Sequence, residues 1–497
     1  MHILFLEVTA QRPKFDVPSR RRFRTFPVWY TNTTKFGMKD FVDRYRPGEK
    51  ESIEDDIINL RQGKPSRLDL SVVTGLSEAE VIDLADAIPD NIVELRLRHC
   101  QQSFVAKVLK RLKETSISTL SLVGNHIDDH LSQGVGELLI ANQGLVEINL
   151  RQNIIETKGA CLIAKGLQIH STLKRVNLSD SIVDNLGKDA LLEAMHHNKS
   201  VTVLTLVGKV FRTVPSIQSF GGMLRMNSTL QELDLRSNPL RREEVIEIAD
   251  ALRRENSTLR VLRLSDTNID SFAAIALGQM LETNMTLTKL DLGGNQNIGF
   301  LGAVAIAKGV RTLKHLDLRN TRLGPVGAKA LALLIRTNKS LKYLNLSRNN
   351  FGDEGAIHVA EALIYNTSLE QLSLSMCSIT KTGAVFIGRT LPMMHGIKHL
   401  FLYQNPIDEE GSQALLEGLM DNMRLADLGI EKRFMPSCEL LSFYLQLNRA
   451  GRRALREENV PDAVWAMVLS SFAATNPSAL FHLLQQKPDL CSRRAEV

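Results

Sequence analysis

One short pattern recurs along most of the chain. It is LxxLxLxxN, in which apolar residues alternate and an asparagine follows. Clear copies are LVEINLRQN (145–153), LQELDLRSN (230–238), LTKLDLGGN (287–295), LKYLNLSRN (341–349) and IKHLFLYQN (397–405). Weaker copies begin at Ile92, Ile117, Leu173, Val201, Leu259, Leu313 and Leu369, and degenerate copies near Pro65 and Leu425 bring the count to fourteen. Such a pattern predicts one structural unit stacked many times, because each unit buries its apolar face only against its neighbours.

The spacing of the copies is nearly constant. Starts from Ile117 to Leu287 are 28 or 29 residues apart, and starts from Leu313 to Leu425 are always 28 residues apart. Each unit continues into a segment with helical periodicity, such as GDEGAIHVAEALIYNTS (352–368). The sequence therefore predicts a strand followed by a helix in every unit. A small residue recurs near the helix start, and we expect it to let the helix pack close to the strand. It is a glycine at positions 159, 187, 327, 355, 383 and 411.

The motif and its helical second half resemble the leucine-rich repeat family, specifically the ribonuclease-inhibitor-like subclass. The resemblance covers about residues 65 to 430. It implies an α/β solenoid, a right-handed βα horseshoe with a parallel concave sheet, a helical convex side and a protein-binding role. Simple geometry agrees, because neighbouring strands lie about 4.8 Å apart while helices need about 8–10 Å, so the array must curve with its strands inside.

Two sets of asparagines follow the repeat, and we interpret both as structural. The first set ends the motif and is expected to satisfy buried backbone groups of neighbouring turns. Cys100 and Cys377 take the same place in two repeats. This set, the asparagine ladder, is Asn125, Asn153, Asn238, Asn295, Asn349 and Asn405. The second set has the form of glycosylation sequons but falls at each helix-to-strand turn, and we interpret it as repeat consensus. It comprises Asn198, Asn227, Asn256, Asn284, Asn338 and Asn366.

The two ends of the chain do not show the repeat. Residues 1–50 hold eleven Lys/Arg and five Asp/Glu, a net charge of 11 − 5 = +6, and we expect a basic, partly disordered extension. Residues 51–64 predict an N-terminal capping helix, 65–430 the repeats, and 431–497 a helical C-terminal cap. Helices are expected at 437–451, 460–474 and 476–488.

Charge and cysteine content restrict the partners and the location. The whole chain carries +6, so residues 51–497 are neutral, which argues against nucleic-acid binding along the repeats. The five cysteines are widely spaced and form no CxxC pair, which is typical of free thiols in a reducing compartment. We find no apolar run long enough to span a membrane. We expect a cytoplasmic monomer, with nuclear entry through the basic cluster Arg20–Arg24 as a further expectation.

A search for catalytic and metal-binding motifs finds none that fits. The sequence lacks GxxxxGK[ST], GxSxG, HExxH and kinase signatures, so we expect a non-enzymatic protein without cofactor or metal. His126 and His130 in HIDDH are interpreted as an exposed helix start. Two alternatives stay open. The GTPase-activating proteins of the Ran cycle are similar horseshoes, and VPDAVWAMVLSSF is similar to the opening of an F-box, which would imply a ubiquitin-ligase adaptor.

The outward strand positions predict the binding surface. They are the second, fourth and sixth residues after the first apolar residue of each repeat. Aromatic side chains gather there in the C-terminal third, beside a ring of charged residues, and such anchors are typical of protein-binding hot spots. The predicted concave-face site is His315, Tyr343, His399, Phe401, Tyr403, Arg236, Asp291, Asp317 and Arg319. A second interpretation is that the C-terminal helices cover the 399–403 strand. We favour the cap at Phe401 and partner contact at His315 and Tyr343.

Overall fold

The computed structural model describes residues 57, 60–62, 66–181, 183–208, 220–431, 438–451 and 470. The chain divides into the units Met1–Asp43 and Arg44–Val497, and the second unit contains all of the described residues. The basic extension 1–50 with Arg20–Arg24 and the predicted helices 460–474 and 476–488 lie outside these residues, apart from Ser470, which is helical. Of the predicted capping helix, residues 57 and 60–62 are described, and they are helical.

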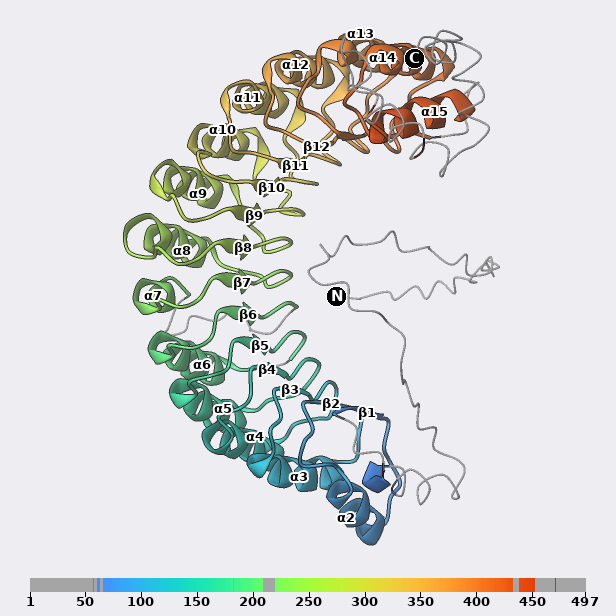
Figure 1. Cartoon of the computed structure of the whole chain (residues 1–497). Helices are drawn as coiled ribbons and strands as arrows, with labels where there is room; N and C mark the ends of the chain where they lie inside the picture. The colour runs from blue at the N-terminus through green and yellow to red at the C-terminus, as the bar shows by residue number, and fades with distance from the viewer. Residues whose placement is uncertain are drawn as a thin grey trace, which may run out of the picture. The chain divides into compact units, whose positions relative to one another are not determined.

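The unit Arg44–Val497 is built on a single parallel sheet of fourteen strands in the described residues, and each strand pairs with the next one along the chain. The strands line the concave side and the helices the convex side (Figure 1). This confirms the predicted leucine-rich repeat solenoid. The strands are β1 (Arg67–Ser71), β2 (Glu94–Arg98), β3 (Thr119–Ser121), β4 (Glu147–Asn149), β5 (Arg175–Asn177), β6 (Val203–Thr205), β7 (Glu232–Asp234), β8 (Val261–Arg263), β9 (Lys289–Asp291), β10 (His315–Asp317), β11 (Tyr343–Asn345), β12 (Gln371–Ser373), β13 (His399–Phe401) and β14 (Asp427–Gly429).

The helices run side by side along the outer side of the sheet (Figure 1). Two short 3-10 helices, η1 (Leu112–Glu114) and η2 (Leu391–Met393), extend two of them. The described α-helices are α2 (Glu78–Asp86), α3 (Gln102–Arg111), α4 (Asp129–Ala141), α5 (Thr157–Ile169), α6 (Asn185–His197), α7 (Phe220–Met226), α8 (Arg242–Arg254), α9 (Ser271–Thr283), α10 (Gly299–Gly309), α11 (Gly324–Thr337), α12 (Gly352–Tyr365), α13 (Lys381–Thr390), α14 (Glu409–Asp421) and α15 (Cys438–Arg449).

A continuous apolar core lies between the sheet and the helices. The middle residue of each three-residue strand is apolar and pairs in register with its counterparts, as Leu316 does with Leu290 and Leu344. All three side chains are at most 1% exposed. The alternation of the motif thus turns the middle side chain of these strands, and the two leucines of β1 and of β2, toward the core and their neighbours toward the concave face.

Both asparagine sets are buried and hydrogen-bonded to the preceding repeat. Asn349 Nδ2 donates to the carbonyls of Leu318 (2.7 Å) and Leu346 (2.9 Å), and its Oδ1 accepts from the backbone N–H of Thr321 (3.0 Å). In the second set, Asn284 Nδ2 donates to Leu252 O at 2.7 Å. Since the six members of that set are no more than 7% exposed, their amides stabilise the turns from inside and face no solvent that a glycan would need.

The turn after each strand uses a left-handed backbone conformation in almost every repeat. The residue before each ladder position has a positive φ, for example +54° at Asp180, +62° at Arg348 and +56° at Met376. Glycine occupies this place at Gly124, with φ +68°. The stacked fold imposes this conformation on residues that adopt it at a cost of about 1–2 kcal/mol each.

The recurring glycine near the helix start contacts the preceding helix, and not the strand as the sequence suggested. A Cβ atom added at Gly355 would lie 2.9 Å from the Ala328 Cβ on α11 and 2.7 Å from the Phe351 Cβ. At Gly411 the same atom would lie 3.0 Å from Ala384 Cβ on α13. Glycine suits this position in these repeats because the adjacent helices approach closely there, while α4, α8 and α9 hold Leu131, Glu244 and Ala273 at the equivalent place.

One ion pair spans a whole repeat. Lys188 on α6 reaches Glu244 on α8 across α7, of which Phe220–Met226 are described, with Nζ and Oε1 2.7 Å apart. Its Nζ also lies 5.1 Å from the centre of the Phe220 ring. The Lys188 and Glu244 side chains are 3% and 10% exposed. This buried ion pair joins two repeats that are not adjacent in sequence.

Helix α15 packs against the last repeat. Asn448 Nδ2 donates to the carbonyls of Asn422 and Leu425, both at 2.9 Å, and so satisfies backbone groups that a following repeat would otherwise bond. None of the helices in the described part of the chain is long and apolar enough to cross a membrane.

Candidate functional site

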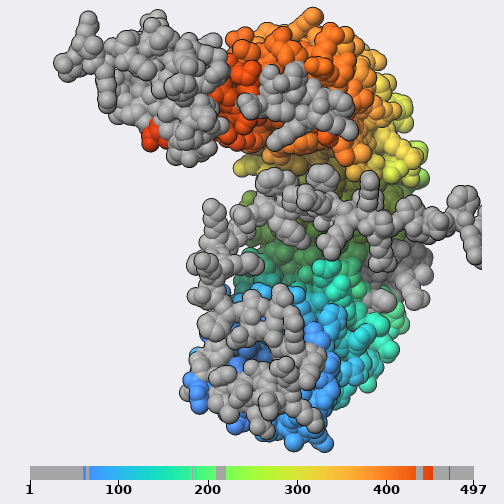
Figure 2. All heavy atoms as spheres, turned by 90° about the vertical axis from the view of Figure 1, so that its right-hand side faces the viewer, coloured from blue at the N-terminus to red at the C-terminus, as the bar shows by residue number. Residues whose placement is uncertain are grey.

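The concave face is formed by rows of side chains that run across the strands. Residues at the second and fourth repeat positions lie in register on adjacent strands. From β9 to β13 the first row is Lys289, His315, Tyr343, Gln371 and His399, and the second is Asp291, Asp317, Asn345, Ser373 and Phe401. Figure 2 looks onto the open side of the repeat unit, where the coloured repeats follow one another from blue through green to orange. Six of the nine predicted site residues lie in these rows, and the other three, Arg236, Arg319 and Tyr403, follow β7, β10 and β13 at the sixth repeat position.

A central cluster of hydrogen-bonded side chains occupies β9 to β11. Asp317 lies at its centre: its Oδ2 accepts from Asn345 Nδ2 at 3.1 Å, and its Oδ1 accepts from the backbone N–H of Arg319 at 2.9 Å. The Arg319 guanidinium lies 3.6 Å from the same carboxylate. Asp291 pairs with Asp317 across the sheet and accepts from the backbone N–H of Gly293 at 3.1 Å. Both carboxylates therefore close the turn of their own repeat as well as facing the concave surface.

Burial changes the ionisation of this central cluster. It raises the pKa of Asp317 to about 6, and the neighbouring Asp291 carboxylate acts in the same direction. Burial also raises the pKa of Tyr343 to about 12, so the phenol stays protonated. The pKa of His315 is lowered, first by burial and then by the charges of Lys289 and Lys314. The surface around Asp317 thus offers neutral donors and acceptors together with its charges.

Two aromatic side chains of the central cluster lie against each other. The rings of His315 and Tyr343 are 5.8 Å apart between centroids and tilted by 37°. Small side chains follow on β12, where Ser373 Oγ lies 2.7 Å from Ser347 Oγ. Since a rigid aromatic pair loses little conformational entropy on binding, this arrangement is suited to contact a partner.

Arg236 belongs to a second group of charges on β7 and β8. Its guanidinium binds both oxygens of Asp234, with Nη2 2.7 Å from Oδ2 and Nε 2.9 Å from Oδ1. Arg263 bonds Glu232 on the neighbouring strand. The charged residues of the predicted site therefore fall into two separate groups. Arg236 is bound by Asp234 of β7, and Arg319 lies against Asp317.

The aromatic strand β13 is joined to the C-terminal cap through its histidine. His399 Nδ1 lies 2.6 Å from Asp427 Oδ2 on β14, and Arg449 of α15 bonds the same carboxylate. Phe401 and Tyr403 stack on each other, with centroids 6.1 Å apart, and lean over Gly429. A Cβ atom at Gly429 would lie 2.4 Å from the Tyr403 ring. Tyr403 nevertheless keeps 46% of its surface exposed, so it faces outward while the strand beneath it is tied to the cap.

Several residues of this surface were not singled out from the sequence. Lys289 and Asn345 complete the central cluster, and Glu232, Asp234 and Arg263 form the second group. All five lie two or four residues after the first apolar residue of their repeat, so the motif alone predicts that they face outward. Their pairing could not be predicted, because it depends on which charges meet across neighbouring strands.

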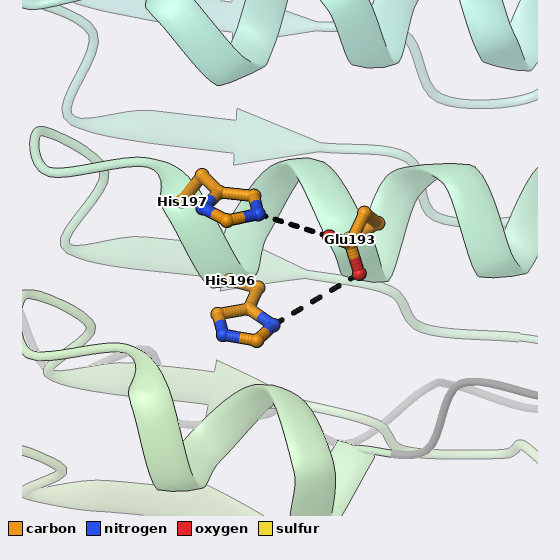
Figure 3. A group of neighbouring side chains, drawn as sticks. All are labelled: Glu193, His196 and His197. Atoms are coloured by element: carbon orange, nitrogen blue, oxygen red, sulfur yellow. Dashed lines mark hydrogen bonds and ion pairs between the residues drawn. The ribbon is translucent and has the colours of Figure 1, made fainter.

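A different group of possible metal ligands lies at the end of α6. Glu193, His196 and His197 place ligand atoms within 4.8 Å of one another (Figure 3). Glu193 lies 2.9 Å from His197 Nε2 and 3.9 Å from His196 Nδ1. The two rings are stacked 4.8 Å apart and nearly parallel, at 7°. A metal ion must lie in the plane of each ring that binds it, so this geometry fits ion pairing at a helix C-terminus better than a shared ion. His126 and His130 of the HIDDH pattern are both exposed, and Asp128 between them is the N-cap of α4, so their interpretation as an exposed helix start is confirmed.

Comparison with known proteins identifies the class. The family model described as Leucine Rich repeat matches residues 227–243, 255–278, 283–307, 311–332, 337–360 and 365–388. The chain is a leucine-rich repeat protein. Ribonuclease inhibitor from Sus scrofa is 28% identical over 186 residues, which is 37% of this chain and 40% of that protein. Together with the long helical repeats, this places the chain in the ribonuclease-inhibitor-like subclass, as the motif predicted.

Other proteins match part of the chain. NACHT, LRR and PYD domains-containing protein 12 from Mus musculus is 26% identical over 248 residues, covering 43% of this chain and 23% of that protein. The chain thus spans about a quarter to two fifths of the length of these curated relatives. A chain of the solved structure titled "Crystal structure of Rad7 and Elc1 complex in yeast" has a TM-score of 0.42 and 16% identity, covering 78% of this chain and 90% of that one.

Proposed function

We propose that this protein is a non-enzymatic scaffold or recognition protein that binds another protein along the concave face of its repeat sheet. The observation that carries the proposal is the central cluster from Lys289 to Asn345 and its continuation to Tyr403. Tyr343 and Tyr403 supply aromatic anchors, and Asp317 and Arg319 supply charges held in fixed positions. Anchors surrounded by oriented polar groups are what a specific protein interface requires.

The relatives support the same function by analogy. Ribonuclease inhibitor is named for its action on an enzyme, which is a folded protein partner. A partner of that kind needs a long curved surface with many contacts, and the rows of outward side chains offer one. The fold alone does not name the partner, since leucine-rich repeats vary their surface residues on one scaffold.

The test is affinity capture from cell extract with the intact chain and two concave variants. One variant is Tyr343→Ala/Arg319→Ala in the central cluster, and the other is Phe401→Ala/Tyr403→Ala on β13. We expect the intact chain to capture one defined protein and at least one variant to bind it about tenfold less tightly, as loss of a hot-spot residue does. A convex control, Gln279→Ala/Glu361→Ala, changes two exposed residues and should bind like the intact chain.

Circular dichroism and thermal melting verify that each variant is folded. Equal binding by both concave variants would contradict the proposal. The same preparations separate the two alternatives: stimulated GTP hydrolysis by a Ran-type GTPase would indicate a GTPase-activating protein, and co-purification of a Skp1-like subunit would indicate a ubiquitin-ligase adaptor.

A further inference from the structure

Helices α9, α10 and α11 present an apolar surface to solvent on the convex side, away from the concave face. They lie side by side in Figure 1. Their outward side chains include five large apolar residues that are about half or more exposed. These residues, the convex patch, are Phe272 (61%), Phe300 (49%), Leu301 (53%), Val326 (60%) and Leu333 (64%).

The patch is aligned by the repeat. Phe272, Leu301 and Val326 each follow by three residues the buried apolar residue that precedes their helix, so they form one row across three helices. The same position holds Glu243 on α8 and Glu354 on α12, and both are exposed. The apolar row is therefore three helices wide, with a carboxylate at the same position on each flanking helix. On the α8 side the Arg242 guanidinium also lies over the Phe272 ring, 4.7 Å from its centre.

The surface beneath the patch is closely packed. A Cβ atom at Gly278 of α9 would lie 2.6 Å from the backbone of Ala305, and one at Gly309 of α10 would lie 2.0 Å from the Gly278 carbonyl oxygen. The backbones of α9 and α10 are thus in contact, with no room for side chains between them. Close packing keeps the apolar residues on a shallow, continuous surface.

The charges on α10 and α11 have one sign, and α9 adds one exposed carboxylate, Glu282, near its C-terminal end. Neither α10 nor α11 contains an aspartate or a glutamate. Lys308, Arg311 and Lys329 are exposed, and they form no ion pair with any residue that the structure describes. Arg336 lies over the Tyr365 ring, 4.4 Å from its centre. A contiguous exposed apolar surface with such charges marks an interaction site for an apolar and acidic partner.

We propose that the convex patch binds an acidic amphipathic helix of a partner protein. Three helices 8–10 Å apart span about 20 Å, which a helix of about 13 residues matches at 1.5 Å per residue. Such a helix places its apolar face on Phe272, Leu301 and Val326 and its carboxylates near Lys308 and Lys329. An anionic membrane is a poorer fit, because a broad negative surface would also meet Glu243 and Glu354 on the flanking helices.

The test uses a phage-displayed library of random peptides of about 15 residues, a length that spans the patch. It is selected on the full-length chain and depleted on the variant Leu301→Glu/Val326→Glu, whose two sites are exposed and tolerate charge. We expect the enriched peptides to carry more Asp and Glu than Lys and Arg, with apolar residues at helical spacing. A synthetic enriched peptide should bind the intact chain about tenfold more tightly than it binds this variant.

Two further variants and a binding measurement with phosphatidylserine vesicles complete the test. Lys308→Glu/Lys329→Glu should also weaken the peptide about tenfold. The concave variant Phe401→Ala/Tyr403→Ala should bind the peptide normally, so a failure of the concave proposal would leave this result unchanged. Three outcomes would overturn the inference: no enrichment over the depleting variant, enrichment of basic peptides, or binding of phosphatidylserine vesicles through Leu301 and Val326 without any acidic peptide.

Discussion

Asp317 serves two purposes with one carboxylate. It accepts the backbone N–H of Arg319, which closes the turn of its repeat, and it also faces the concave surface beside Asp291. The repeat needs an oxygen at this place, and asparagine supplies it on the next strand at Asn345. The turn needs only the oxygen of Asp317 and not its negative charge. The free-energy cost of burying that charge should therefore appear in the pH dependence of stability.

We predict that Asp317→Asn stabilises the fold at neutral pH. The folded pKa of about 6 lies above the ordinary 3.8, so ionisation destabilises the folded state. This cost is absent below pH 3.8, grows as the pH rises, and is complete above about pH 6. The rise in pKa from 3.8 to about 6 means that ionised Asp317 costs the folded state about 3 kcal/mol, which the asparagine variant avoids. The amide makes one hydrogen bond fewer than the carboxylate, and this offsets about 1 kcal/mol of the gain in stability. Urea unfolding at pH 7.5 should show a rise of about 1–2 kcal/mol in the free energy of unfolding.

The rise should disappear at pH 4, where the wild-type carboxyl is protonated in the folded state. Asp421→Asn, at an exposed position on α14, is the matched control and should change stability by less than about 0.5 kcal/mol. A gain of equal size at both pH values would show that packing, and not charge, is responsible.

Helices and strands could be predicted closely from the sequence, because each repeat supplies its own periodicity. The strands begin at the second motif position, and α12 (Gly352–Tyr365) and α15 (Cys438–Arg449) fall within the segments that the pattern predicted. The contacts between repeats could not be predicted equally well. The glycine contact with the preceding helix and the pairing of Arg236 with Asp234 depend on the angle and distance between units, which no single repeat encodes.

The Lys188–Glu244 pair is the clearest contact of this kind. It joins residues 56 positions apart, on α6 and α8, across α7. Glu244 also accepts from the backbone N–H of Arg241 at 3.1 Å, and the Arg241 guanidinium lies 3.7 Å from the same carboxylate, so Glu244 keeps partners without the lysine. The pair therefore links two repeats that flank a third.

We predict that Lys188→Met lowers the free energy of unfolding by about 2 kcal/mol, since the buried Glu244 carboxylate loses its closest cation and keeps the more distant Arg241 guanidinium, 3.7 Å away. The double variant Lys188→Met/Glu244→Gln should lose less than the sum of the two single changes, because the buried charge is then gone. Guanidinium denaturation of all four proteins measures the coupling. An additive result would show that the two side chains contribute separately. Lys165→Met, at an exposed position on α5, is the control.

The repeat unit as a whole depends on how its last repeat is closed. Helix α15 satisfies the carbonyls of Asn422 and Leu425 through Asn448, and its Arg449 reaches the Asp427 carboxylate that holds His399. The order of the last concave strand is thus linked to the cap. In an array whose repeats contact mainly their neighbours, loss of the cap contacts would disorder the last repeat first. The disorder would then spread inward from that end.

We predict that Asn448→Ala loosens the C-terminal repeats selectively. Hydrogen exchange monitored by mass spectrometry should accelerate about tenfold or more in residues 399–429, because two buried carbonyls lose their donor at a cost of about 1–3 kcal/mol. Residues 94–177 should exchange as in the wild type. Uniform acceleration along the chain would instead indicate that the unit unfolds as one cooperative block.

The strand order of the sheet has a consequence for how such a chain can change over evolutionary time. Since every strand pairs only with the strands before and after it in sequence, a duplicated or deleted repeat inserts or removes one layer and leaves all the others with equivalent neighbours. The shorter steps before β3 and before β10 are local variations that the array has already absorbed. The length of the concave surface, and with it the size of the partner it can hold, is therefore open to selection in whole-repeat increments.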